Sequence, residues 1–403
     1  MKKFIVLFLI GVLIICNSYS TCKAMARDVI QNNEISLGTY KEKDDFDTLE
    51  EYQAYLESNP AAVQELIDSA DTVFSVNANV IAQHRYLLNN LSHTGLAIQK
   101  AYIDGNYIYV LRNSKVNYPN YFYFNTNSYL SRYYVNWNTY EAVYMDCMVL
   151  QNFGHGQTLE SFTRNGNTYF WVACKAGDIL EGDTADNGRR WATQIGRMQY
   201  IAGATIDYTS IPRLSALHRA NKDGKAFDGT GVKRVDAAMS SDGKTLFIWA
   251  KCDTEMQFAF YRTSALNSIF DTLENQSSKY ISCGSENVKA ACKNSFNSIG
   301  KAISLPNGSF QGCEIDDSGN IYIIGGSKYD TPKIRKISYN GNVLKTVAIT
   351  GTENNPQFVG DAEIEGIQLL GDYLYFVNYN PNYPAGSAGE VQYIYSIPVS
   401  YMN

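Results

Sequence analysis

The sequence of 403 residues carries few of the residues and motifs on which common enzyme families depend. It has four histidines and no His-Glu-x-x-His, Gly-x-Ser-x-Gly or phosphate-binding loop, which excludes the zinc-peptidase, α/β-hydrolase and P-loop motifs. No Cys-x-x-Cys occurs, so zinc ribbons and thioredoxin-type redox sites are excluded as well. Charged residues make up 18% of the chain and the net charge is −6, so we expect no nucleic-acid partner.

Long apolar runs are also missing, apart from one at the N-terminus. Two lysines precede an apolar run over residues 4–16, and Ala24-Met25-Ala26 offers a small-x-small cleavage site. The run is too short to span a bilayer, so we expect a secretory signal peptide over residues 1–26. A lipoprotein signal ending at Cys16 is the alternative, but the preceding isoleucine fits lipoprotein processing poorly. We therefore expect a monomer that is secreted, or associated with the cell surface, with no transmembrane segment in the mature chain.

Removal of residues 1–26 takes away three lysines and no acid, which changes the net charge from −6 to −9. It also leaves six cysteines: Cys147, Cys174, Cys252, Cys283, Cys292 and Cys313. An even number in an oxidising compartment favours disulfides, whereas buried thiols are the alternative. The pairs that we expect are Cys283–Cys292, Cys147–Cys174 and Cys252–Cys313.

Residues 27–70 form a polar leader in front of a β-rich body over residues 71–403. Within the leader, Thr48 to Glu51 fit a helix capping box, and Asn59-Pro60 provides a second helix start. We expect two short helices over residues 47–70. Because such helices are marginally stable alone, the leader is either a docked N-terminal extension or a removable propeptide.

One turn pattern recurs through the body. A glycine is followed each time by a short apolar strand, and a turn-forming residue precedes it in four of five cases; the glycines are Gly105, Gly166, Gly243, Gly319 and Gly371. They are 61, 77, 76 and 52 residues apart, which leaves room for four strands in each repeat. The sequence therefore predicts an all-β fold, a β-propeller with five blades. A divergent sixth blade and a two-domain β-sandwich are the alternatives, and the polar stretch 265–300 is expected to be a long loop or small insertion.

An acid or amide lies five to seven residues before each of these glycines. These residues are Gln99, Glu160, Asp236, Glu314 and Glu365. Because the first strand of a propeller blade lines the central channel, we expect these side chains to form a polar ring at one channel mouth. Four carboxylates close together require a cation, a basic partner, raised pKa values or water, and a divalent cation such as calcium is one candidate. A solvated channel wall with ordinary hydrogen bonds is the alternative.

Two histidines, His93 and His155, lie at equivalent positions, shortly before two of these strands. We expect them to share a structural role in a turn; a role as a catalytic base is the alternative.

Aromatic residues are concentrated over 118–140 and 373–383, with asparagine and serine between them. This pattern is typical of surfaces that bind sugar rings or another protein, and equally of packing between blades.

Several stretches resemble the helveticin J family of large secreted bacteriocins. They occur in the family's order over residues 92–378: Gly154 to Glu160, Trp191 to Arg197, Pro212 to Ser215 with Arg219-Ala220, Val235 to Ser240, Gln311 to Asp316 with Gly319 to Ile323, and Glu363 to Gln368. The resemblance implies a secreted antibacterial protein with a propeller-like body, and it transfers no catalytic residue. Arg213, within one of these stretches, is a further candidate for the site. The leader and the six mature cysteines depart from the family's pattern.

Three functions are compatible with these observations. The first is a secreted bacteriocin that binds a component of the target bacterial envelope, for which a glycan is one candidate. The second is a glycan-binding or cell-surface propeller that does not kill. The third is a polysaccharide-cleaving enzyme that uses two channel carboxylates. We favour them in this order, and thus a binding protein over an enzyme.

Overall fold

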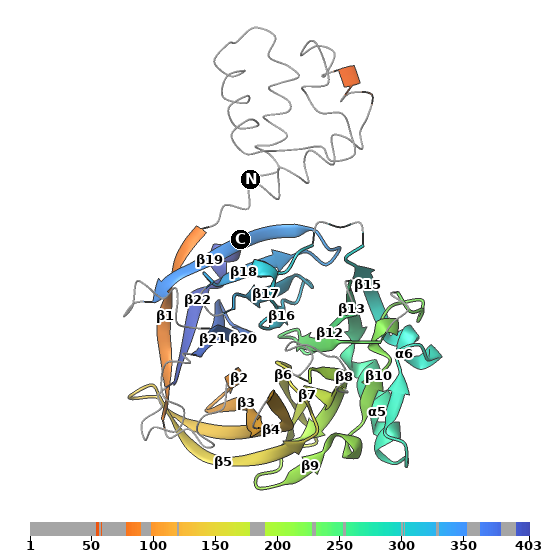
Figure 1. Cartoon of the computed structure of the whole chain (residues 1–403), viewed down its shortest axis with the longest axis horizontal. Helices are drawn as coiled ribbons and strands as arrows, with labels where there is room; N and C mark the ends of the chain where they lie inside the picture. Colours follow the sequence, from red (N-terminus) through yellow and green to blue (C-terminus); the bar gives the residue numbers. More distant parts are fainter. Residues whose placement is uncertain are drawn as a thin grey trace.

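A computed structural model describes the chain over residues 54–55, 58, 78–89, 98–118, 121–177, 190–227, 231–252, 255–299, 301, 303–327, 330–352, 363–379 and 392–403. The expected signal peptide, His93 and all but three residues of the expected leader lie outside these ranges. What the structure describes is therefore the β-rich body. Figure 1 shows its strands arranged around a common centre.

In the ranges that the structure describes, antiparallel pairing joins the strands into five sets of four, which we call blades one to five. Blade one contains β2 (Ile98–Asp104), β3 (Tyr107–Tyr118), β4 (Tyr121–Asn136) and β5 (Glu141–Gln151). Blade two contains β6 (Leu159–Arg164), β7 (Asn167–Ala176), β8 (Ala192–Gln199) and β10 (Arg213–Ser215). Blade three contains β11 (Arg234–Met239), β12 (Thr245–Lys251), β13 (Met256–Arg262) and β15 (Cys292–Asn297). Blade four contains β16 (Cys313–Ile315), β17 (Ile321–Gly325), β18 (Lys333–Ile337) and β19 (Val343–Thr352).

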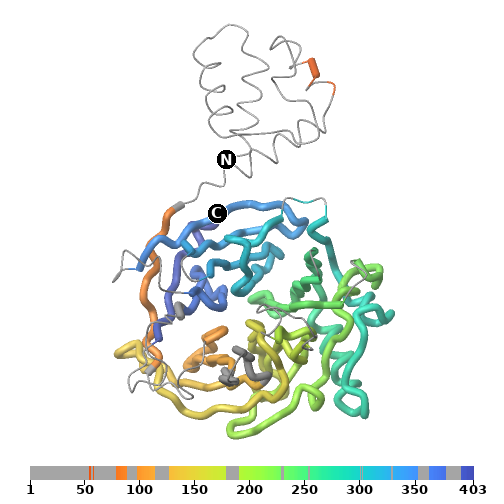
Figure 2. The backbone as a smooth tube through the Cα atoms, viewed as in Figure 1, coloured from red at the N-terminus to blue at the C-terminus, as the bar shows by residue number. Residues whose placement is uncertain are grey.

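Blade five joins the two ends of the body. Its strands are β20 (Glu363–Leu370), β21 (Tyr373–Tyr379), β22 (Gln392–Pro398) and, antiparallel to β22, the first strand β1 (Ala78–Asn89). Figure 2 shows this first strand in orange beside the blue C-terminal segment. The short elements β9 (Thr205–Asp207), β14 (Tyr280–Ser282), η3 (Tyr208–Ser210), η4 (Leu217–Arg219), η5 (Pro306–Gly308) and η6 (Val399–Met402) lie between or beside the blades.

The innermost strands of the blades, β2, β6, β11, β16 and β20, contact one another in a closed cycle. The apolar core is divided in the same way, because each of five buried clusters combines residues from two neighbouring blades. One cluster joins blade five to blade one through Val377, Ile394, Ile108 and Val110. A β-sandwich would bury one core between two sheets, so the prediction of a β-propeller is confirmed and the sandwich alternative is wrong.

The five glycines of the repeating pattern occupy equivalent positions. Each lies in the turn between the first and second strand of its blade, and each has a positive φ: Gly105 (57°), Gly166 (76°), Gly243 (68°), Gly319 (80°) and Gly371 (57°). Glycine is favoured in such turns because its missing Cβ removes the steric penalty of a left-handed backbone. The repeat read from the sequence therefore marks the hairpin that begins each blade.

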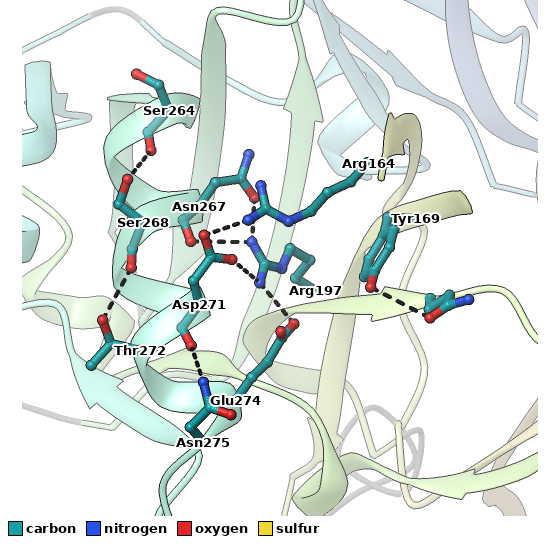
Figure 3. A network of polar contacts seen from close by, with 11 residues as sticks. Arg164, Tyr169, Arg197, Ser264, Asn267, Ser268, Asp271, Thr272, Glu274 and Asn275 are labelled. Atoms are coloured by element: carbon teal, nitrogen blue, oxygen red, sulfur yellow. Dashed lines mark hydrogen bonds and ion pairs between the residues drawn. The ribbon is translucent and has the colours of Figure 1, made fainter. Parts of the chain in front are cut away.

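The stretch expected to be a long loop or small insertion contains two helices. α5 (Thr263–Glu274) and α6 (Glu286–Ala291) lie between the third and fourth strands of blade three. Buried Arg197 of β8 holds α5 against blade two, since its guanidinium contacts Asp271 and Glu274, each at 2.7 Å, as Figure 3 shows. In the part of the chain that the structure describes, no helix is long and apolar enough to cross a membrane.

The expected disulfides are not formed in this structure. All six cysteines of the body are thiols, and five of them are buried. Cys283 and Cys292 belong to one apolar cluster, which also contains Tyr261. Burial raises the pKa of Cys174 to about 12 and that of Cys292 to about 11, so both stay protonated and weakly reactive at neutral pH.

Candidate functional site

The five predicted ring residues all lie on the innermost strands, one in each blade. Gln99 is on β2, Glu160 on β6, Asp236 on β11, Glu314 on β16 and Glu365 on β20, and each is at most 4% exposed. Because these strands contact one another around the centre, the fold gathers the five side chains into one buried polar region. The structure thus brings together residues that are up to 266 positions apart in the sequence.

A buried lysine lies close to two of these acidic side chains. The Nζ atom of Lys100 lies 2.5 Å from Oε1 of Glu160 and 4.0 Å from Oε2 of Glu314. Burial alone would lower the pKa of Lys100, but the charges of Glu160 and Glu314 outweigh it and raise that pKa. Lys100 therefore remains a cation, and it supplies the positive charge that the clustered acids require.

Arg234 is a second cation of this central region. Its guanidinium donates to the side-chain oxygen of Gln157 at 2.5 Å and lies 3.5 Å from Oδ2 of Asp236. Asp236 also accepts hydrogen bonds from the backbone N–H of Gln157 at 3.1 Å and from the hydroxyl of Thr158 at 2.7 Å. The amide of Gln157 in turn donates to Glu365. One glutamine thus connects the acids of blades three and five.

Aromatic rings surround Arg234. Its guanidinium lies 3.6 Å from the ring centre of Trp191 and 4.9 Å from that of Phe310. Trp191 stacks on His155 at 3.9 Å, and His155 hydrogen-bonds to Gln99. The other predicted candidate, Arg213, lies elsewhere: it is on β10, the fourth strand of blade two, where it donates to Gln194 at 2.7 Å. Arg213 therefore supports the edge of a blade and does not join the ring.

One end of this buried region reaches solvent. Trp191 and Glu363 are partly exposed, whereas Lys100, Glu160 and Glu314 are fully enclosed. Glu363 accepts a hydrogen bond from Gln311, whose side-chain oxygen accepts another from Gln157 at 3.2 Å. We call the group at this end the channel mouth; its members are His155, Gln157, Trp191, Arg234, Gln311 and Glu363. Trp191 and Glu363 are the accessible members of the mouth, whereas its amides, Gln157 and Gln311, are buried. An accessible aromatic ring beside a carboxylate suits binding of a polar ligand better than acid–base catalysis by the enclosed acids.

Metal ligation is not apparent in the ranges that the structure describes, where no group of three or more His, Cys, Asp or Glu side chains is arranged to hold an ion. The acids at the centre interact instead with Lys100 and Arg234. Sequence reasoning missed both cations. Arg234 could have been found, because residues i and i+2 of a strand share a face and Arg234 is two positions before Asp236.

Glu314 gives the site a pH dependence. Burial and the nearby charge of Glu160 raise its pKa well above the ordinary value, so Glu314 binds its proton more tightly in the folded chain than in the unfolded chain. Its contribution to stability is complete below the ordinary pKa of about 4.3 and is lost as the pH rises toward the folded value.

We expect Glu314→Gln, which imitates the neutral acid, to gain stability relative to the wild type as the pH rises. Between pH 5 and pH 8 the gain in free energy of unfolding should be at least about 1 kcal/mol, measured by urea unfolding at both pH values. Glu141→Gln, on the outer strand β5, serves as the control and should differ from the wild type equally at both pH values. If the difference in free energy of unfolding between Glu314→Gln and the wild type were the same at pH 5 and pH 8, Glu314 would be ionised in the folded protein.

A family model described as bacteriocin helveticin-J matches residues 76–400. The chain belongs to the helveticin J family. The family-like stretches of the sequence supply most of the central residues; residues 154–160, for example, contain His155, Gln157, Thr158 and Glu160. No curated protein matches the chain.

Solved structures similar to this chain are distant in sequence. A mannose phosphorylase from Leishmania mexicana is 8% identical, with a TM-score of 0.38, over 83% of this chain and 94% of that one. A GH43_1 enzyme from Xanthomonas citri is 10% identical, with a TM-score of 0.41, over 82% and 93%. The periplasmic gluconolactonase of Pseudomonas aeruginosa is 12% identical, with a TM-score of 0.30, over 79% and 82%. At these scores the similarities carry no argument about activity.

Proposed function

We propose that this protein is a secreted antibacterial protein that binds a component of the envelope of target bacteria through its channel mouth. The observation that carries the proposal is the match of the bacteriocin helveticin-J family over residues 76–400. The channel mouth supports it, because Trp191, Arg234 and Glu363 combine an aromatic face with polar groups at the accessible end of the site. The enclosed position of Glu160 and Glu314 gives no support to a polysaccharide-cleaving role.

The test compares killing and binding by the secreted full-length protein and two mouth variants. We expect the wild type to bind and inhibit some members of a panel of co-occurring bacteria. Trp191→Ala should reduce cell binding and killing at least about ten-fold, because it removes the largest accessible contact surface of the mouth. Glu363→Gln is a second, milder change that preserves the shape of the side chain. Tyr280→Ala, at an exposed aromatic residue on β14, is the control and should keep full activity.

Binding to cells without loss of viability would favour the non-killing surface propeller over the bacteriocin. No binding and no killing across the panel would overturn the proposal. If both mouth variants killed bacteria as efficiently as the wild type, recognition would take place at another surface.

A further inference from the structure

The hairpin between β4 and β5 exposes an unusual number of large apolar side chains. Tyr134, Trp137, Tyr140, Val143 and Met145 are each 44–55% exposed, although they lie within twelve residues of one another. A hollow of about 470 Å³ lies here, on the outer part of blade one. Figure 1 shows β5 at the rim of the ring, so the hollow is separate from the central site. Its lining includes Tyr134, Asn136, Trp137, Asn138, Val143 and Met145.

The aromatic rings of this hollow are held in place by their neighbours. Nε1 of Trp137 donates to Oδ1 of Asn106 at 2.9 Å, and the Trp137 ring meets Tyr86 edge-on at 6.3 Å. The ring of Tyr134 meets that of Tyr107 edge-on at 6.0 Å. A ring fixed in this way loses little conformational freedom when a ligand stacks on it, which is the usual advantage of a preorganised site.

The chemistry of the lining selects among ligands. Among the described residues that line the hollow none is charged, and the nearby Arg132 is already paired with Asp146 at 2.5 Å. Attraction to an anionic lipid surface or a phosphate therefore has no basis here. The amides of Asn136 and Asn138 offer donors and acceptors beside the aromatic rings, and Asn136 is oriented by accepting the backbone N–H of Asn138 at 3.1 Å.

These features fit one class of ligand. The C–H face of a pyranose ring stacks on an aromatic side chain, and its hydroxyl groups pair with amides. The aliphatic side chains of Val143 and Met145, each 46% exposed, add an apolar surface on which an acetyl methyl group can pack. We propose that this hollow is a binding site for an N-acetylated hexosamine unit of a glycan. The site is distinct from the channel mouth, and its existence does not depend on whether the protein kills.

The experiment uses the full-length protein and tri-N-acetylchitotriose as the probe, with cellotriose as the matched sugar that lacks acetamido groups. We expect titration of the N-acetylated sugar to change tryptophan fluorescence and to give saturable heat in calorimetry, and cellotriose to bind at least about ten-fold more weakly. Trp137→Ala should abolish the response. Trp191→Phe, which alters only the channel mouth, should retain it and thereby separates this site from the proposed function.

A second variant protects the test against loss of folding. Val143→Lys places a charge at the rim of the hollow, leaves Trp137 in place, and should also abolish binding while the melting temperature is preserved. Absence of binding by the wild type, or binding retained in Trp137→Ala, would overturn the proposal. The proposal would also be overturned if the wild type formed a dimer, or attached to phosphatidylcholine vesicles, and Val143→Lys abolished that behaviour. The surface would then serve self-association or lipid contact. If the wild type binds the sugar but does not kill in the viability assay, the proposed function is refuted and the sugar site stands.

Discussion

Lys100→Met is expected to lower the free energy of unfolding by about 3–5 kcal/mol, the cost of removing one partner from a buried ion pair. The substitution keeps the length and apolar stem of the side chain but removes the charge that lies 2.5 Å from Glu160 and 4.0 Å from Glu314. The carboxylate of Glu160 would then be enclosed without a cation. Urea unfolding, followed by tryptophan fluorescence, measures the loss.

Two further variants show whether the loss arises from the buried charge. Lys244→Met removes a lysine that is 78% exposed and lies 2.9 Å from Asp242, so it should leave the free energy of unfolding close to that of the wild type. The double variant Lys100→Met/Glu160→Gln removes the stranded carboxylate together with its cation, and it should recover part of the lost stability. If Lys100→Met proved as stable as Lys244→Met, a group other than Lys100 would balance the charge of the buried acids.

Gly366→Ala is expected to destabilise the body strongly. Gly366 lies on β20 with a φ of +59°, and a Cβ there would come within 2.7 Å of Cα of Lys100 and 2.8 Å of the carbonyl oxygen of Gln99. Both are backbone atoms of the neighbouring inner strand, so neither can move without displacing β2. The close approach of two inner strands at the axis requires a residue without a side chain.

Gly105→Ala provides the matched control for this substitution. Gly105 has a φ of +57°, almost the same as that of Gly366, but nothing lies within 4 Å of its Cβ position. The left-handed backbone should cost each variant about 1–2 kcal/mol, and the clash at Gly366 should add about 1–3 kcal/mol. Urea midpoints and soluble yields of the two variants measure the difference. Equal stability would mean that the inner strands do not pack as closely as described.

Much of the central site followed from local sequence patterns. The Gly-marked turns identified where each blade begins, since a positive φ in a tight hairpin is a local requirement that the sequence has to meet. The acid or amide that precedes each of these turns was then expected on the inner strand of its blade, where Glu160, Asp236 and Glu314 are found. The aromatic hairpin was also recognisable, but which rings pack and which are exposed was not: Tyr133 is fully buried, whereas its neighbour Tyr134 is exposed.

Other features of the molecule depend on tertiary contacts, so the sequence alone could not place them. Arg213 belongs to a family-like stretch, yet it is on the fourth strand of its blade, and strand order within a blade cannot be read from one short motif. The insertion in blade three is helical because Leu266, Phe270 and Leu273 form an apolar face that packs against its neighbours. The six cysteines were expected to pair on account of export, but pairing depends on distances that only the packing of the blades sets.

The sequence by itself determined an all-β repeat with a polar residue on each inner strand, because turn chemistry and strand alternation act over a few residues. Only the tertiary structure decided how the acids are neutralised. A register shift in β2 between Ile98 and Lys100 interrupts the alternation, and Lys100, next to the predicted Gln99, meets Glu160 and Glu314. That contact joins three blades, and no pattern within one of them specifies it.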